Sequence, residues 1–287
     1  METAIKAAAK ASPMDTSRAI SGFYFHRLLC RVFSEENPLF ILKGGQGMLA
    51  RTIDARSTRD IDLLSNEPEV DAALKELRRL ASIDLGDFVT FEFESARPIK
   101  TEDEYRTGMN VSIVPLLGTK RMQAVSIDLV ADKTPCEDAE RITPSDRIDV
   151  AGVPVFDYYV YPVAYAVADK LCAIIETHNE HPSSRVKDLV DILIYATTEA
   201  IDGASFSKQV RTETAARKLS LPKSFSLPQQ WRDNYHAVFA KLCKQTGLPF
   251  QFHSLDQGEG LARKLIDPML ANEVDGKIWN FNTLQWV

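Results

Sequence analysis

The sequence predicts an α/β fold: a small mixed sheet followed by a mostly helical C-terminal domain. Two observations support this prediction. Helical spacing of apolar residues dominates after about residue 160. Short segments with strand periodicity gather in the first half, at 39–42, 60–64, 87–95, 109–116 and 121–130. We therefore expect residues 1–155 to form a sheet domain and residues 156–287 to form a helical domain.

Composition places the chain among ordinary globular proteins, with 45% hydrophobic and 26% charged residues over 287 positions. None of the four cysteines lies in a Cys-x-x-Cys pair, so we expect reduced thiols rather than disulfides or a zinc site. These cysteines are Cys30, Cys136, Cys172 and Cys243. Residues 1–20 lack the apolar core of a signal peptide, and no stretch reaches membrane length. A cytoplasmic protein with no membrane association is the expectation.

Charge is unevenly distributed around the net value of −6. Residues 205–287 contain eleven Lys or Arg and seven Asp or Glu, whereas the rest of the chain is acidic. A basic C-terminal part would suit a nucleic-acid partner, but an ordinary solvated helix surface would have the same composition.

The stretch from residue 39 to residue 65 carries the most chemical information. An apolar run at 39–42 reads as a buried strand and stops at Lys43-Gly44-Gly45. Two glycines let the backbone bend sharply and bring bare N–H groups close to a ligand. A short helical pattern then follows at 46–52.

Asp60 and Asp62 alternate with Ile61 and Leu63, so both carboxylates should leave a strand on one face. Such a pair suits Mg²⁺, which takes a few carboxylate oxygens together with waters and phosphate oxygens. The nearby glycines and helix N-terminus could hold those phosphates. A turn followed by a strand with a solvated acidic face would explain an Asp-x-Asp alone; its combination with the Gly-Gly turn favours a metal and phosphate site.

A third acid, Asp128, lies between Ile127 and Leu129 in a strand pattern. An acid in this setting must point away from the core or toward a partner. It is either a further site residue or an aspartate on the sheet surface.

Other elements of the first half follow from local patterns. We expect a helix capped by Asp15 or Thr16, and a second helix capped by Ser65 or Asn66 with its apolar face at 70–80. Residues 96–108 should be a loop. Residues 131–158 should be a connector with short strand pieces at 149–150 and 153–156.

The second half begins with a helix from Pro162 to about His178, then a polar loop, then a helix at 185–196. Asp188 and Asp191 are three residues apart and share a face of that helix. Further helices are expected at 206–219, 229–245 and 255–270. An aromatic stripe beginning at Trp231 is either core or a base-stacking platform. The closing segment 278–287 should dock on the body or add an edge strand.

Three ordered motifs between residues 39 and 196 resemble the AbiEii/AbiGii toxin family, which includes the mycobacterial MenT toxins and lies in the DNA polymerase beta-type nucleotidyltransferase superfamily. The first is Leu42-Lys43-Gly44-Gly45 together with Ser57-Thr58-Arg59-Asp60-Ile61-Asp62-Leu63-Leu64. The others are Asp169-Lys170-Leu171-Cys172-Ala173 and Arg185-Val186-Lys187-Asp188-Leu189-Val190-Asp191. Members often carry Thr or Ser and then Ala after the glycines. This chain has Gln46-Gly47, so a hydroxyl contact to phosphate is not carried over.

The resemblance implies an NTP-dependent nucleotidyltransferase with Mg²⁺ or Mn²⁺. Asp60 and Asp62 would bind the metal, and Asp128 would complete a second metal site or activate the attacking hydroxyl. Lys170 would bind the β- and γ-phosphates. Asp188 or Asp191 would position Lys170 or act as general base. The other implied nucleotide-binding residues are Lys43, Gly44, Gly45, Gln46, Arg59, Arg185 and Lys187.

The resemblance also implies a toxin from a bacterial toxin–antitoxin pair, with a cognate antitoxin as partner. In the MenT branch the acceptor is the 3′ end of tRNA, and its modification blocks translation. Two alternatives remain open from the sequence. One is a nucleotidyltransferase acting on a protein or small-molecule hydroxyl, and the other is a homologue that binds nucleotide or partner without turnover.

Overall fold

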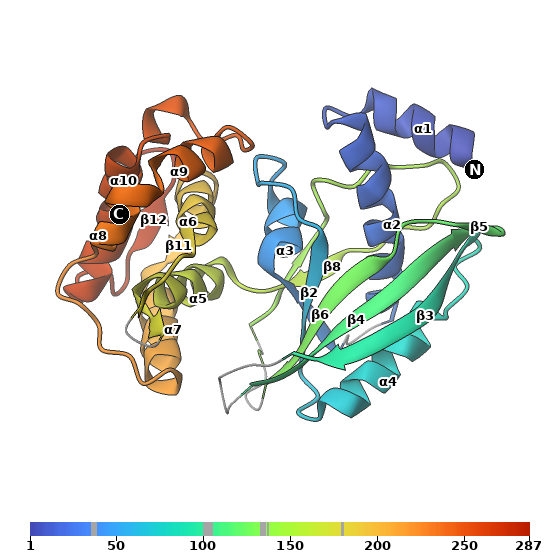
Figure 1. Cartoon of the computed structure of the whole chain (residues 1–287), viewed down its shortest axis with the longest axis horizontal. Coiled ribbons are helices and arrows are strands. Elements are labelled where there is room, and N and C mark those ends of the chain that lie inside the picture. The colour runs from blue at the N-terminus through green and yellow to red at the C-terminus, as the bar shows by residue number, and fades with distance from the viewer. Residues whose placement is uncertain (36–38, 100–105, 133–135, 137, 179–180) are drawn as a thin grey trace. The chain divides into compact units, whose positions relative to one another are not determined.

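The computed structural model describes residues 1–35, 39–99, 106–132, 136, 138–178 and 181–287. It divides into two compact units (Figure 1). The sheet unit comprises Met1–Ile53 and Ser57–Tyr161, and the helical unit comprises Asp54–Arg56 and Pro162–Val287. The sheet unit thus runs to Tyr161 rather than to residue 155, because the last strand of its sheet ends only at Val160.

A mixed sheet forms the frame of the sheet unit, as the sequence predicts. Its order in the described residues is β3-β4-β6-β2-β1-β8-β7, with β5 beside β4. The β2–β6 and β1–β8 pairs are parallel, and the others are antiparallel. The strands are β1 (Phe40–Lys43), β2 (Asp60–Ser65), β3 (Val89–Pro98), β4 (Arg106–Leu117), β5 (Lys120–Arg121), β6 (Val125–Asp132), β7 (Glu140–Ile142) and β8 (Tyr158–Val160).

Two helices, α2 (Thr16–Val32) and α4 (Val70–Ala81), cover one face of this sheet, and Figure 1 shows α4 lying along it. Alternation explains why: Ile61 and Ile127 leave the strands on the same face and join Leu28 and Leu77 in one buried cluster. The residues between them in β2 and β6 must therefore point to the opposite face. Two further helices belong to this unit, α1 (Glu2–Ala11) and α3 (Gly44–Arg51).

A buried ion cluster ties α2 to the start of β3. Asp87 accepts from Arg27 Nε at 2.6 Å and from Arg31 Nη2 at 2.9 Å, and all three side chains are almost fully buried. Burial opposes the charge of Asp87, but the two guanidinium groups outweigh it and lower the pKa of this carboxyl.

Three local expectations are tested by these elements. Asp15 caps α2 by accepting from the Arg18 amide at 3.0 Å, as predicted. The cap predicted for α4 is wrong, since Ser65 still belongs to β2 and α4 begins only after Glu69. The strand pieces predicted at 149–150 and 153–156 are also wrong. Gly152 has φ +77° and Pro154 has no N–H to donate, so this stretch cannot form a ladder.

The helical unit consists of α5 (Val163–Ile175), α6 (Val186–Thr198), α7 (Gly203–Ala216), α8 (Gln229–Asn234), α9 (His236–Cys243), the 3₁₀ turn η1 (Phe250–Phe252) and α10 (Leu255–Leu270). The helix predicted at 229–245 is broken at Tyr235. The loop predicted at 96–108 is narrower, because β3 and β4 extend into it, and its centre lies outside the described residues.

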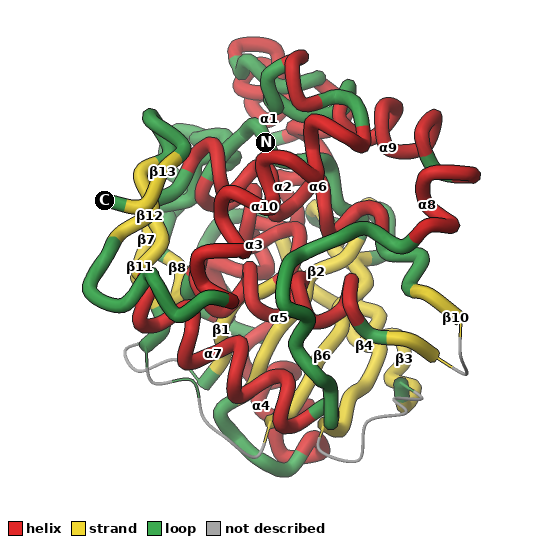
Figure 2. The backbone as a smooth tube through the Cα atoms, turned by 90° about the vertical axis from the view of Figure 1, so that its left-hand side faces the viewer, coloured by secondary structure: helices red, strands yellow, loops and turns green. Residues whose placement is uncertain are grey.

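Short ladders complete the helical unit. The C-terminal segment forms β12 (Ile278–Asn280) and β13 (Gln285–Trp286), which pair in one small sheet with β11 (Ile201–Asp202) (Figure 2). The closing segment therefore adds strands, with β13 at the edge of this small sheet, which is one of the two outcomes expected for it. A second ladder joins β9 (Thr177–His178) to β10 (His181–Pro182).

Burial settles several expectations. Trp231 and Phe239 are fully buried, so the aromatic stripe is core rather than a stacking platform. The four cysteines are buried and free. Among the described residues, no helix combines the length and the apolar character needed to span a membrane.

Candidate active site

The acids of β2 and β6 lie on one face of the sheet. Asp62 and Asp128 are register partners in the parallel β2–β6 pair, and Asp60 lies two residues before Asp62 on the same side. All three are partly exposed, in contrast to the buried Ile61 and Ile127 of the covered face. The sheet therefore presents three carboxylates from two adjacent strands.

The Gly-Gly turn packs directly against this acidic strand. Gly44 has φ +60°, and a Cβ at this position would overlap the Asp62 carboxylate. A Cβ on Gly45 would press on Thr58. The first turn of α3 thus approaches Asp62 of β2 and the preceding Thr58 more closely than a Cβ atom allows. The N–H groups that open α3 consequently lie beside Asp62, which suits phosphate binding.

Neutral side chains hold two of the acids. Thr58 Oγ1 donates to Asp60 Oδ1 at 2.5 Å, and Asn110 Nδ2 donates to Asp128 Oδ1 at 2.7 Å and to Ser126 Oγ at 2.9 Å. Each bond restrains one carboxylate oxygen without neutralising its charge. Asn110 was not found from the sequence, because only the β4–β6 register places it opposite Asp128.

The donor set fits a hard divalent cation, which prefers carboxylate oxygens and fills its remaining positions with water and substrate phosphates. Asp60 and Asp62 come from one strand face, and Asp62 lies next to the N-terminus of α3. Within the described ranges, no three His, Cys, Asp or Glu side chains approach closely enough to form a ligand cluster on their own.

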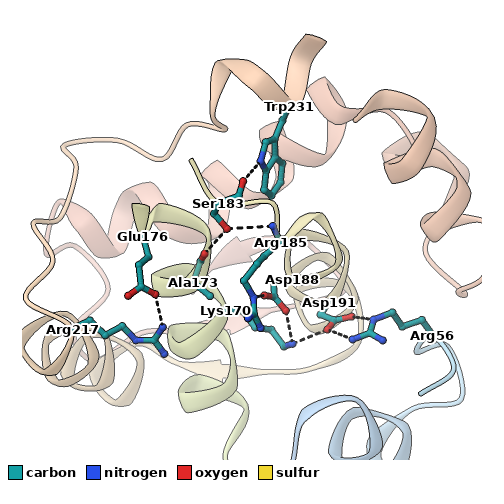
Figure 3. A network of polar contacts seen from close by, with 10 residues as sticks. All are labelled: Arg56, Lys170, Ala173, Glu176, Ser183, Arg185, Asp188, Asp191, Arg217 and Trp231. Carbon is teal, nitrogen blue, oxygen red and sulfur yellow. Dashed lines mark hydrogen bonds and ion pairs between the residues drawn. The ribbon is translucent and has the colours of Figure 1, made fainter. Parts of the chain in front are cut away.

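A second polar cluster forms inside the helical unit around Lys170 of α5 (Figure 3). Lys170 Nζ donates to Asp191 Oδ2 at 2.7 Å and to Asp188 Oδ1 at 3.4 Å. Arg56 donates to both oxygens of Asp191 at 3.0 and 3.2 Å, and Arg185 Nε donates to Asp188 Oδ2 at 2.5 Å. Three cations thus surround two carboxylates, leaving a net positive charge at a Lys170 side chain that is 12% exposed.

Electrostatics fix the charge states in this cluster. Burial disfavours the ammonium of Lys170, but Asp191 and Asp188 outweigh burial and raise its pKa. Burial likewise opposes the charge of Asp188, but Lys170 and Arg185 lower the pKa of that carboxyl. Asp188 is therefore a weak proton acceptor whose geometry suits orienting Lys170.

Hydrogen bonds of Ser183, from both its side chain and its backbone, fix the segment that leads into α6. Ser183 Oγ donates to the Ala173 carbonyl at 2.7 Å and accepts from the Arg185 amide at 3.3 Å, while buried Trp231 Nε1 donates to the Ser183 carbonyl at 2.6 Å (Figure 3). These contacts fix where α6 begins relative to α5. They thereby set the positions from which Asp188 and Asp191 meet Lys170.

A family model described as "Nucleotidyl transferase AbiEii toxin, Type IV TA system" matches residues 27–257, which include both the acidic strands and the Lys170 cluster. The chain belongs to the AbiEii family. The family predicted from three short motifs is confirmed, and with it membership of a nucleotidyltransferase family of type IV toxin–antitoxin systems.

Two solved structures from Helicobacter pylori are similar to this AbiEii-family chain over most of its length. One is JHP933, with 14% identity, coverage of 88% of this chain and 94% of that one, and a TM-score of 0.47. The other is a candidate nucleotidyltransferase with 14% identity, coverage of 89% and 97%, and a TM-score of 0.48. Among curated proteins, none matches this sequence.

Of the remaining residues predicted to bind nucleotide in this AbiEii-family chain, four are cations and one is an amide. Lys43 lies over the Tyr161 ring with its Nζ 4.0 Å from the centroid, and Arg59 is exposed immediately before Asp60. Arg185 is half exposed, and Lys187 is exposed on α6. Gln46 differs from these cations because its side chain is buried and its Nε2 donates to Asp146 at 2.9 Å.

Proposed function

We propose that this protein transfers a nucleoside monophosphate from an NTP to the 3′ hydroxyl of an RNA, and that tRNA is the acceptor through which it blocks translation. The observation that carries the proposal is the acidic strand face: Asp60, Asp62 and Asp128 point the same way, and Asp62 lies against the N-terminus of α3. Family membership supports the reaction class.

Each group has a role in this proposal. Asp60 and Asp62 would hold Mg²⁺, and the ion would supply charge neutralisation at the phosphates. The N–H groups opening α3 bind phosphate oxygens. Lys170 binds the terminal phosphates as a fixed positive charge that becomes more favourable as pyrophosphate leaves.

The proposed transfer forms one bond to phosphorus, breaks another, and needs an acceptor for the hydroxyl proton. The acceptor hydroxyl oxygen bonds to the α-phosphorus as the α–β bridging bond breaks, and pyrophosphate takes the bridging oxygen. Asp128 accepts the hydroxyl proton through the oxygen that Asn110 does not hold. Asp188 and Asp191 orient Lys170 rather than move protons, since the low pKa of Asp188 makes it a poor base.

RNA is preferred over a protein acceptor because residues 205–287 contain eleven Lys or Arg against seven Asp or Glu, and their lysines are exposed. A cognate antitoxin is the expected protein partner, in keeping with the family's toxin–antitoxin description. A protein or small-molecule hydroxyl is the competing acceptor.

Labelled NTPs offered with total RNA and total protein test both acceptors at once. The RNA pool should become labelled, with the label removed by ribonuclease. Asp62→Asn keeps the side-chain shape but removes the charge, and it should lower transfer by at least about two orders of magnitude. Label in the protein pool alone would replace RNA by a protein acceptor. Full activity of a folded Asp62→Asn protein would remove the acidic strand from the mechanism.

A further inference from the structure

A cavity of about 610 Å³ lies within the sheet unit, at one end of the acidic strands. Its wall includes 57–59 and 122–125, the segments that lead into β2 and β6. Since β2 and β6 are parallel and Asp60 is the first residue of β2, the cavity opens beside the end at which Asp60 lies. Thr58 both lines the cavity and donates to Asp60, so a ligand there would touch a residue that contacts the acidic site.

The inner end of the cavity carries a fixed hydrogen-bonding group. Gln46 Nε2 donates to Asp146 Oδ2 at 2.9 Å, and His26 Nε2 lies 3.3 Å from Asp146 Oδ1. His26 Nδ1 is in turn 3.0 Å from the Tyr158 hydroxyl. Burial opposes the charge of Asp146, but His26 and Gln46 lower its pKa, so it remains an acceptor. This fixes the Gln46 amide with its nitrogen toward Asp146, and its carbonyl oxygen and second N–H are the groups it can offer a ligand.

Tyr24, Phe25 and Met122 contribute apolar side chains to the wall. Arg59 adds a cation at the end nearest Asp60. The lining also includes a second amide, Gln123, and a second cation, Arg18. Apolar side chains together with amides and cations match a planar heterocycle that carries a phosphate.

One glycine keeps the slot open. Gly22 lies inside α2 and lines the cavity, yet a Cβ there would meet nothing within 4 Å. A glycine inside a helix costs roughly 1 kcal/mol relative to alanine, and no neighbouring atom requires it at this position. The empty volume in front of Gly22 is therefore space that the protein itself does not fill.

We propose that this cavity binds a nucleobase, with the base stacked on the apolar wall and its polar edge paired to Gln46. The proposal rests on the proposed function and specifies where its nucleotide is recognised. The base belongs either to the NTP or to the terminal nucleotide of the RNA acceptor, and the two share the same chemistry.

Gly22→Leu tests this directly, because leucine fills the slot and is a better helix former than glycine. Gly260→Leu is the matched control: Gly260 also lies inside a helix, α10, with nothing within 4 Å of a Cβ, and it does not line the cavity. The dissociation constant of each labelled NTP would be measured by equilibrium dialysis without acceptor. The KM for total tRNA would be measured in the transfer assay, with melting temperatures confirming the fold.

We expect Gly22→Leu to weaken one of these two constants at least about tenfold, as lost base stacking requires, while Gly260→Leu changes neither. A weaker NTP dissociation constant assigns the cavity to the NTP base. A raised KM for tRNA with an unchanged NTP constant assigns it to the acceptor base. Two unchanged constants in a folded Gly22→Leu protein would overturn the proposal. If wild type labels no RNA but the NTP constant still shifts, the proposed acceptor fails and the cavity assignment stands.

Discussion

Lys170 is held by two carboxylates in the polar cluster of the helical unit. Its ammonium has three N–H donors, and Asp191 and Asp188 accept from it at 2.7 and 3.4 Å. Two acids, each shared with an arginine, therefore restrain the end of a flexible side chain. A lysine restrained in this way has already lost much of its rotamer entropy in the folded protein.

Replacing Lys170 by Met separates phosphate binding from a merely structural role. Methionine keeps most of the apolar stem and the helix propensity, so the helix should persist by circular dichroism. Loss of the preorganised charge should slow single-turnover transfer by about two to three orders of magnitude. Lys170→Arg should recover only part of the rate, since a planar fork does not replace a compact ammonium. A Lys170→Met protein within about threefold of wild type would exclude Lys170 from the reaction.

Asn110 should act as a positioning residue for Asp128. Asn110→Leu retains the volume but removes the donor, which frees one Asp128 oxygen to rotate. We expect activity to fall about tenfold, with a several-fold rise in the Mg²⁺ concentration needed for half-maximal rate. Ser112→Ala is the control, because Ser112 lies two residues along β4 and donates instead to Glu94. An equal loss in both variants, with unchanged Mg²⁺ dependence, would make Asn110 a general structural residue.

The candidate site residues that the sequence predicts are those marked by a local spacing pattern. Alternation alone places Asp60 and Asp62 on one strand face, and the spacing of Asp188 and Asp191 places them on one helix face. Asn110 and Asp146 have no such signal, because strand register and a hydrogen bond across a hundred residues connect them to the site. Such residues become visible only when the chain is folded.

At the scale of elements, the cluster of Asp87 with Arg27 and Arg31 fixes α2 to the sheet. It buries one carboxylate between two guanidinium groups, and Arg31 also donates to the Val89 carbonyl. Removing the acid would leave two buried cations without a counter-charge.

Asp87→Ala should therefore lower the free energy of unfolding by about 3 to 5 kcal/mol in a urea titration. Asp84→Ala is the neighbouring control and should cost less than about 1 kcal/mol, since Asp84 is exposed. A loss of equal size in the two variants would contradict a special role for the buried cluster.

The same carboxyl should make stability sensitive to acid. Its pKa is lowered in the folded protein, so its contribution is complete above the unfolded pKa of about 3.9. The contribution is lost as the pH falls from there through the folded pKa. Wild type should lose stability over this acidic range more steeply than Asp87→Ala, as measured by urea midpoints between neutral pH and pH 3.

The predicted bounds of a helix match the observed bounds where the capping residue and the apolar periodicity indicate the same ends. The last long helix, α10, has the predicted bounds Leu255–Leu270, and Ser254 caps it by accepting from the Gln257 amide. The helix predicted at 229–245 breaks at Tyr235, directly after Asn234, whose Nδ2 donates to the Gln230 carbonyl at 3.3 Å and so competes for a backbone group. The apolar periodicity continues across Tyr235, so the sequence pattern alone predicts one uninterrupted helix.

At the scale of the whole chain, a count of basic residues in the sequence does not show which of them are ion-paired with acids in the folded protein. Of the cations between residues 205 and 287, Arg217 is ion-paired with Glu176 and Glu213, and Arg263 with Asp267. Neighbouring acids therefore partly balance the charges of these two arginines, and the exposed lysines are the better choice for a test of nucleic-acid binding. The lysines of this stretch are exposed.

Lys218→Gln combined with Lys264→Gln should weaken RNA binding and reduce the dependence of log K on log salt by up to about 1.4 to 1.8, if each lysine contacts one phosphate. The paired control is Lys10→Gln with Lys75→Gln, which removes two exposed lysines from the sheet unit. Affinity measured across a salt series would decide the outcome. Identical slopes for wild type and the Lys218/Lys264 double variant would favour a protein or small-molecule acceptor.

The three residues Asp54–Arg56 belong to the helical unit although their neighbours on both sides belong to the sheet unit. The Gly247 amide donates to the Asp54 carbonyl at 2.8 Å, and Arg56 binds Asp191. No single cut in the chain can therefore yield two complete fragments. A fragment starting at Pro162 would leave buried Asp191 without its arginine, and a fragment ending at Tyr161 would leave Arg56 without its acid. Dissecting this protein will require point variants in the full chain.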